Sequence, residues 1–153
     1  MQSLTEGNFV LAKLEDGEKV MPTLLDVIEE EEIFSGIILS GIGMLRDFNL
    51  NYFDGKKYVE RQYMKPLELV ALHGSIAVDS SVHLHAALAD KDHKMVGGHL
   101  SAGVVNNLVE LTIFKLENRH IERKLNPKTG LSEFHLVSRP PLYVEPDDDE
   151  GDE

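Results

Sequence analysis

Apolar and polar residues alternate with a period of two along much of the chain, a pattern that is typical of β-strands. Turn residues bound these runs, and the alternation predicts strands at 9–14, 48–53, 57–63, 67–78, 82–88, 96–100 and 107–116. The segment 33–42 is instead continuously apolar and rich in isoleucine, which favours a strand covered on both faces. Gly41 and Gly43 predict a tight connection from this segment to the strand at 48–53.

One segment has helical rather than strand spacing. Pro22 is followed by apolar residues that share one helical face and then by four glutamates, which predicts a helix over 22–32. Many strands with one clear helix predict an α/β (α+β) domain, in which helices pack on a mainly antiparallel sheet.

The length and the charge limit the organisation of the chain. With 153 residues there is room for one domain, which we expect over 1–146. Residues 147–153 (DDDEGDE) carry six acidic groups, so the net charge of −12 leaves −12 + 6 = −6 for the rest. We expect 147–153 to be a disordered, solubilising tail, the alternative being that it occupies a basic partner or mimics nucleic acid. No apolar run reaches the roughly 20 residues that cross a bilayer, and residues 1–8 lack a signal pattern, so we expect a cytoplasmic protein.

Histidine is the residue type that carries candidate chemistry. The chain has no cysteine, so any zinc site must use histidine and carboxylate ligands. His83 and His85 are separated by one residue on a predicted strand and therefore share a face. A turn at 90–94 returns the chain to Gly97-Gly98-His99, which could bring a third imidazole to the pair. We expect a divalent-metal site, with zinc as the ion, in which three protein ligands leave one position open.

Other polar residues are weaker candidates. Glu110 and His73 could supply a fourth ligand or hydrogen-bond a ligand, and Glu110 is the natural general acid or base if the site is catalytic. Asp90 is expected to initiate the turn. The remaining histidines are expected at the surface or in turns, and these are His93, His120 and His135.

Several longer segments resemble the PPC (plants and prokaryotes conserved) domain family. They are LEDGEKV, SGIILSGIGMLRDFNLNYFD, PLELVALHGSIA, and VHLHAALADKDHKMVGGHLSAGVV followed by VELTIF. The resemblance is strong over about 7–117 and weaker to about 136. It implies an α/β fold with a mainly antiparallel sheet, a homotrimer, and in prokaryotic members a histidine metal site that maps onto His83, His85 and His99. Plant members bind AT-rich DNA through a separate AT-hook, an Arg-Gly-Arg-Pro-type segment that this sequence lacks.

Three functions follow from these observations. The first hypothesis is a trimeric, metal-binding interaction or regulatory module that contacts itself and other proteins. The alternative is a metal-dependent hydrolase or lyase that uses the open three-histidine site. Direct DNA binding ranks last, because duplex binding depends on Lys and Arg, and here these residues are interleaved with acidic ones.

Overall fold

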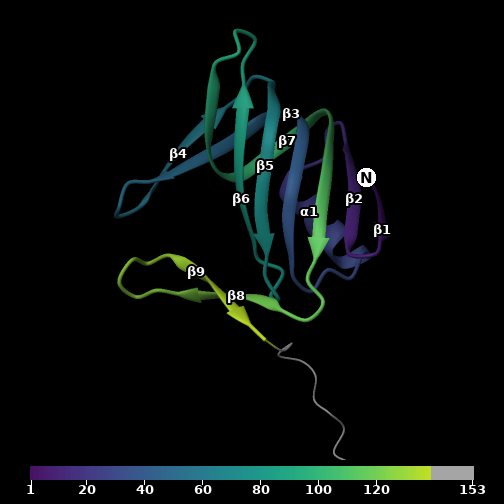
Figure 1. Ribbon diagram of the computed structural model, residues 1–153. Helices are drawn as coiled ribbons and strands as arrows, with labels where there is room; N and C mark the ends of the chain where they lie inside the picture. The colour runs from purple at the N-terminus through teal and green to yellow at the C-terminus, as the bar shows by residue number, and fades with distance from the viewer. Residues whose placement is uncertain (139–153) are drawn as a thin grey trace, which may run out of the picture.

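The computed structural model describes residues 1–138, which form nine strands and one helix (Figure 1). The elements, in chain order, are β1 (Gln2–Glu6), β2 (Phe9–Glu15), α1 (Val20–Glu30), β3 (Gly36–Phe53), β4 (Tyr58–Tyr63), β5 (Leu67–Ile76), β6 (Val82–Ala89), β7 (Met95–Lys115), β8 (His120–Leu125) and β9 (Ser132–Val137).

The main sheet has seven strands in the order β1-β2-β7-β6-β5-β3-β4, and every pairing in it is antiparallel. Strand β3 also pairs with β7, so β3, β5, β6 and β7 form a closed ring of hydrogen-bonded strands. This closure removes free edges from the centre of the sheet. The predicted, mainly antiparallel fold with a packed helix is confirmed, although the described residues contain a single helix.

The hydrophobic core lies between the inner faces of these strands and the helix. Helix α1 begins two residues earlier than predicted and packs against β2 and β7. Its apolar face is buried, and so are alternate residues of the strands, such as Leu84 and Leu88 on β6. Because strand side chains alternate between faces, the residues between these positions point to the outside of the ring.

Two predicted interruptions between strands are wrong. The predicted connection at Gly41–Gly43 lies inside β3, and the strands predicted at 96–100 and 107–116 are both part of β7. Bulges, rather than turns, interrupt the pairing of β3 with β7, one of them between Gly43 and Leu45. A β-bulge bends a strand and increases its twist, which allows two long strands to curve around the ring.

The segment after residue 117 forms a separate hairpin of β8 and β9, which contains the predicted turn at 126–130. Its base is fixed to the main sheet, because the Val78 amide donates to the Ile121 carbonyl and the Ile121 amide donates to Ser35 Oγ. In Figure 1 this hairpin lies beneath the lower ends of β5 and β6, whereas β4 projects from the same side of the sheet at a higher level. The acidic stretch 147–153 lies outside the described residues. Within residues 1–138, no helix is long and apolar enough to cross a membrane.

Candidate metal centre

His83 and His85 project from the outer face of β6. Leu84 and Ala86 occupy the alternate positions and are buried in the core. The apolar positions therefore fix the orientation of the strand, and a shift of one residue would bury the two imidazoles instead. This part of the site follows from local strand alternation alone.

His99 reaches the pair because β7 returns beside β6. The turn at 90–94 is closed by a hydrogen bond from the Asp90 amide to the Lys94 carbonyl, and His99 then pairs directly with His85. Strand β7 is also close to β3 here, since a Cβ atom on Gly98 would lie 2.9 Å from the Asn51 carbonyl oxygen. Glycine at position 98 therefore lets β7 lie this close to β3 beside His99.

The three imidazoles form a compact group. One ligand nitrogen from each of His83, His85 and His99 lies within 4.8 Å of the other two. Two nitrogens bound to a tetrahedral zinc at about 2.0–2.1 Å lie about 3.4 Å apart, so small side-chain rotations would complete the coordination. His99 Nδ1 is buried and has no hydrogen-bond partner among the described residues. A buried nitrogen without a partner is costly unless an ion or water occupies its lone pair, so these residues fit a divalent metal.

Burial keeps two of the rings in the form that binds metals. It lowers the pKa of His83 to about 4, with smaller contributions from the nearby charges of Arg123, His99 and His85. Burial, followed by the proximity of His85, also lowers the pKa of His99. Both rings are therefore neutral at pH 7, and a metal ion does not have to displace protons from them.

Of the two candidates for a fourth group, Glu110 lies far along β7, whereas His73 is a cross-strand neighbour of His85 whose ring contacts another residue. Glu110 is exposed on the distant part of β7 and pairs with Lys13 and Ile42. It is 110 − 99 = 11 residues from His99, which along a strand corresponds to roughly 35 Å. His73 pairs with His85 in register, but its Nδ1 lies 2.9 Å from the Leu39 carbonyl oxygen. Within one chain, neither residue belongs to the group of three histidines.

The other polar candidates have structural positions. The Asp90 carboxylate accepts hydrogen bonds from the amides of Asp92 and Lys94, as expected of a turn residue. His93 in the same turn and His135 on β9 are exposed, as predicted. The prediction for His120 is wrong, since it is only 3% exposed at the base of the hairpin.

A pocket of about 350 Å³ opens beside the histidines, between the β4 arm and the β8–β9 hairpin. Besides His83 and His99 it is lined by Tyr58, Ser81, Val82, Arg123, Gly130, Leu131 and Ser132. The ring of Tyr58 lies 5.4 Å from that of His99. Neither Tyr58 nor Arg123 was predicted as a site residue from the sequence, because no local motif marks either of them.

The comparisons with known proteins agree with this fold. The chain is 31% identical to a metal-containing protein from Archaeoglobus fulgidus, with a TM-score of 0.76 over 84% of this chain and 94% of that one. It is 29% identical to a plant- and prokaryote-conserved protein from Pyrococcus horikoshii, with a TM-score of 0.77 over 86% and 93% of the two chains. It is also 29% identical over 125 residues to the bifunctional protein GlmU of Synechococcus sp. (strain JA-3-3Ab), but this match covers 81% of the chain and only 20% of that protein.

The family resemblance noted in the sequence is confirmed by a match to a whole-family sequence model. The Plants and Prokaryotes Conserved (PCC) domain matches residues 1–117, which include the three histidines and end before β8. The ring of strands, the helix and the three histidines all lie within the matched part. This chain therefore belongs to the Plants and Prokaryotes Conserved domain family.

Proposed function

We propose that this protein is a zinc-binding member of its family that acts as a homotrimeric interaction or regulatory module. The observation that carries the metal assignment is the group of three imidazoles whose ligand nitrogens lie within 4.8 Å of one another. The relative from Archaeoglobus fulgidus, described as metal-containing, supports the same assignment. His83, His85 and His99 would hold the ion, which when bound supplies a Lewis-acidic position beside the pocket.

The residues around the pocket favour a binding role over catalysis. A metal-dependent hydrolase or lyase needs a general acid or base within hydrogen-bonding reach of the reacting group. Glu110, the residue proposed for this role, lies far along β7, and none of the residues that line the pocket is acidic. The enzyme hypothesis therefore remains the second candidate, with the open pocket as its support.

An exposed apolar face supports self-association. It lies on the outer side of β1, β2, β3, β5 and β7 and consists of Leu4, Phe9, Leu11, Leu39, Ile42, Val70 and Leu108. Exposed charged residues such as Lys13 and Glu110 lie among these apolar side chains, a mixture that protein interfaces also show. None of these residues lies on β6 or lines the pocket, and we propose that a trimer formed through this face leaves the histidines accessible. The number of three subunits is taken from the family resemblance.

Metal content tests the first part of the proposal. We expect about one zinc per chain in the purified, untagged protein after zinc loading and removal of excess ion. The His83→Ala/His85→Ala variant removes two of the three ligands and is expected to retain none. Elemental analysis of both proteins, with circular dichroism to verify folding, provides the measurement. A folded wild-type protein without zinc would contradict the metal assignment.

The oligomeric state tests the second part. Ile42 is 47% exposed in the middle of the apolar face, so we expect Ile42→Glu to dissociate the trimer into monomers. Leu125→Glu is the matched control, because Leu125 is 71% exposed on the β8–β9 hairpin, outside that face. Light scattering at equal protein concentrations should give a trimer for the wild type and the control. A monomeric wild type, or a trimeric Ile42→Glu variant, would contradict this interface.

Direct DNA binding has the least support. The net charge of −12 opposes association with phosphate, and the chain lacks an AT-hook. We propose that the trimer acts in the cytoplasm and that its further partners are other proteins.

A further inference from the structure

The lining of the pocket beside the histidines carries a positive charge, although the protein as a whole is acidic. The whole chain carries a net charge of −12, yet the lining of the pocket contains one arginine, Arg123, and no acidic residue. A zinc ion at the three imidazoles would add two further positive charges at the same place. Such a pocket attracts anions, and its low-dielectric walls strengthen that attraction relative to open water.

Arg123 is directed toward the histidines by the packing of the β8–β9 hairpin. Its Nη2 donates a hydrogen bond to Ser75 Oγ on β5, and Ser75 pairs in register with His83. Directly opposed residues of an antiparallel pair have Cβ atoms about 4.5–5.5 Å apart, so the Arg123 guanidinium lies next to the His83 side chain.

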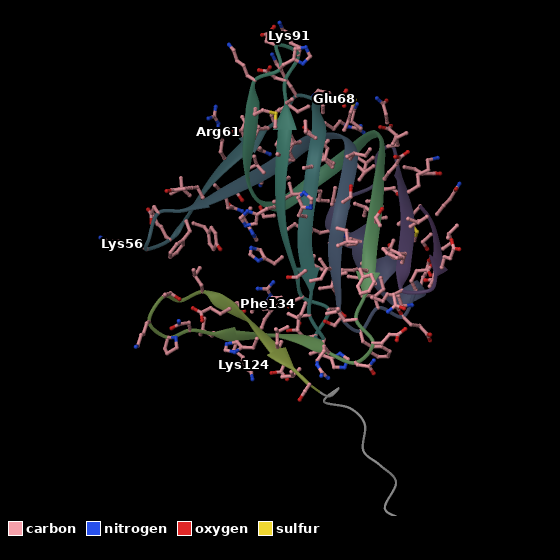
Figure 2. The ribbon with its side chains drawn as sticks, viewed as in Figure 1. Lys56, Arg61, Glu68, Lys91, Lys124 and Phe134 are labelled. Carbon is pink, nitrogen blue, oxygen red and sulfur yellow. The ribbon has the colours of Figure 1, made fainter. Side chains whose placement is uncertain are left out.

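Phe134, on the neighbouring strand of the hairpin, also helps to hold Arg123 in place. Arg123 pairs in register with Phe134, and its guanidinium carbon lies 5.7 Å from the centre of the Phe134 ring. Figure 2 shows Phe134 on the side of the hairpin that faces the main sheet and Lys124 on the opposite side. The next residue, Lys124, binds Glu122 at 2.7 Å and is 57% exposed. The hairpin therefore presents one of two adjacent cations to the pocket and the other to solvent.

Donors remain available for a ligand in the pocket. A guanidinium has five N–H donors, and within residues 1–138 that of Arg123 uses one, in the bond to Ser75. Ser81 also lines the pocket, but its hydroxyl and its amide lie beside the Asp79 carboxylate and lower the pKa of that group, so Arg123 is the donor left for a ligand. The guanidinium lies beside the open side of the histidine cluster. Val82 and Leu131 add apolar walls.

We propose that Arg123 forms a subsite that binds a small oxyanion, a carboxylate or a phosphate, next to the metal. The planar fork of arginine matches the paired oxygens of both groups, and a volume of about 350 Å³ admits a small molecule rather than a polymer. This inference rests on the proposed metal site, because the ion and the guanidinium attract the ligand together. It assigns to the β8–β9 hairpin the role of selecting an anionic ligand.

Cobalt-loaded protein provides a test with two separate readouts. Co²⁺ in a three-histidine site gives visible absorption bands that depend on its coordination geometry, so the bands first report whether the metal binds. Titration with acetate or with inorganic phosphate then reports whether an anion enters beside the metal. We expect saturable changes in the bands, and the tighter of the two probes distinguishes a carboxylate subsite from a phosphate subsite.

Three variants separate the role of the guanidinium from that of net charge and of hairpin anchoring. Arg123→Gln is expected to keep the cobalt bands and to bind the preferred anion about ten- to hundredfold more weakly, as is typical for the loss of a charge-assisted hydrogen bond. Lys124→Gln removes the same charge from the solvent side and should bind like the wild type. Ser75→Ala removes the hydrogen bond that positions Arg123 but keeps the charge of Arg123, and is expected to weaken anion binding less than Arg123→Gln does.

The possible results distinguish a failure of the metal site from a failure of the anion subsite. Absence of cobalt bands in the wild type would overturn the metal site and this inference together. Cobalt bands with equal anion affinity in the wild type and Arg123→Gln would overturn the anion subsite alone. Equal weakening in Arg123→Gln and Lys124→Gln would also overturn it, because net charge rather than the guanidinium would then account for binding.

Discussion

The His99→Gln variant is expected to bind zinc about a hundredfold or more weakly than the wild type. Structural zinc sites with four ligands bind with about 10–16 kcal/mol, so each ligand contributes roughly 3 kcal/mol. Loss of that contribution corresponds to about two orders of magnitude in the dissociation constant. His99 is the ligand most dependent on tertiary structure, because it comes from β7 whereas His83 and His85 share β6. Competition with a chelating indicator measures the affinity.

His93→Gln is the matched control for this prediction. His93 is exposed in the turn between β6 and β7, only six residues before His99 (99 − 93 = 6), and is not part of the histidine group. It should bind zinc with wild-type affinity. Equal affinities for the wild type and His99→Gln would show that His99 is not a ligand, and an equal loss in both variants would point to a general effect on folding.

Substitution of Gly43 by alanine is expected to destabilise the fold strongly, although it adds a single methyl group. A Cβ atom at this position would lie 2.1 Å from the Leu108 carbonyl oxygen and 2.8 Å from the Val109 Cα, both on the backbone of β7. Since backbone cannot rotate away, β3 and β7 would have to separate at the bulge that lets them curve. We expect the overpacking and the positive φ of Gly43, +143°, together to cost about 3 kcal/mol in the free energy of unfolding, against a typical total of about 5–15 kcal/mol.

Gly55→Ala separates this clash from the cost of backbone conformation. Gly55 also has a positive φ, +94°, but nothing lies within 4 Å of the position that a Cβ atom would take in the β3–β4 turn. It should therefore lose only about 1–2 kcal/mol. Urea unfolding followed by circular dichroism, at equal chain concentration because the protein is proposed to be a trimer, gives both values. Similar losses in the two variants would contradict the close approach of β3 and β7.

The predictable part of the site is the part that depends on local geometry. The spacing of His83 and His85 fixes their common face, and the Asp90 turn returns the chain to His99. Strand alternation and turn chemistry act over a few residues, so they can be inferred without knowing the rest of the fold.

The incorrect predictions depend on contacts between distant segments. Gly41 and Gly43 indicated a turn, yet they lie within β3 and the clash at Gly43 comes from β7, more than sixty residues later (108 − 43 = 65). Arg123 reaches His83 across 123 − 83 = 40 residues because the hairpin packs beneath β5 and β6. Glu110 is suitable by residue type, but within one chain the single long strand β7 separates it from His99, so its role in the site stays a prediction.

The most direct test of the three-histidine metal site is X-ray absorption at the zinc edge of the loaded, full-length protein. We predict a first shell of about four nitrogen or oxygen ligands at about 2.0–2.1 Å, with the outer-shell scattering of three imidazoles. That result would show zinc held by three imidazoles, the number that His83, His85 and His99 supply, with one position left for another ligand. A shell with fewer than two imidazoles, or one dominated by carboxylate oxygens, would contradict the central claim.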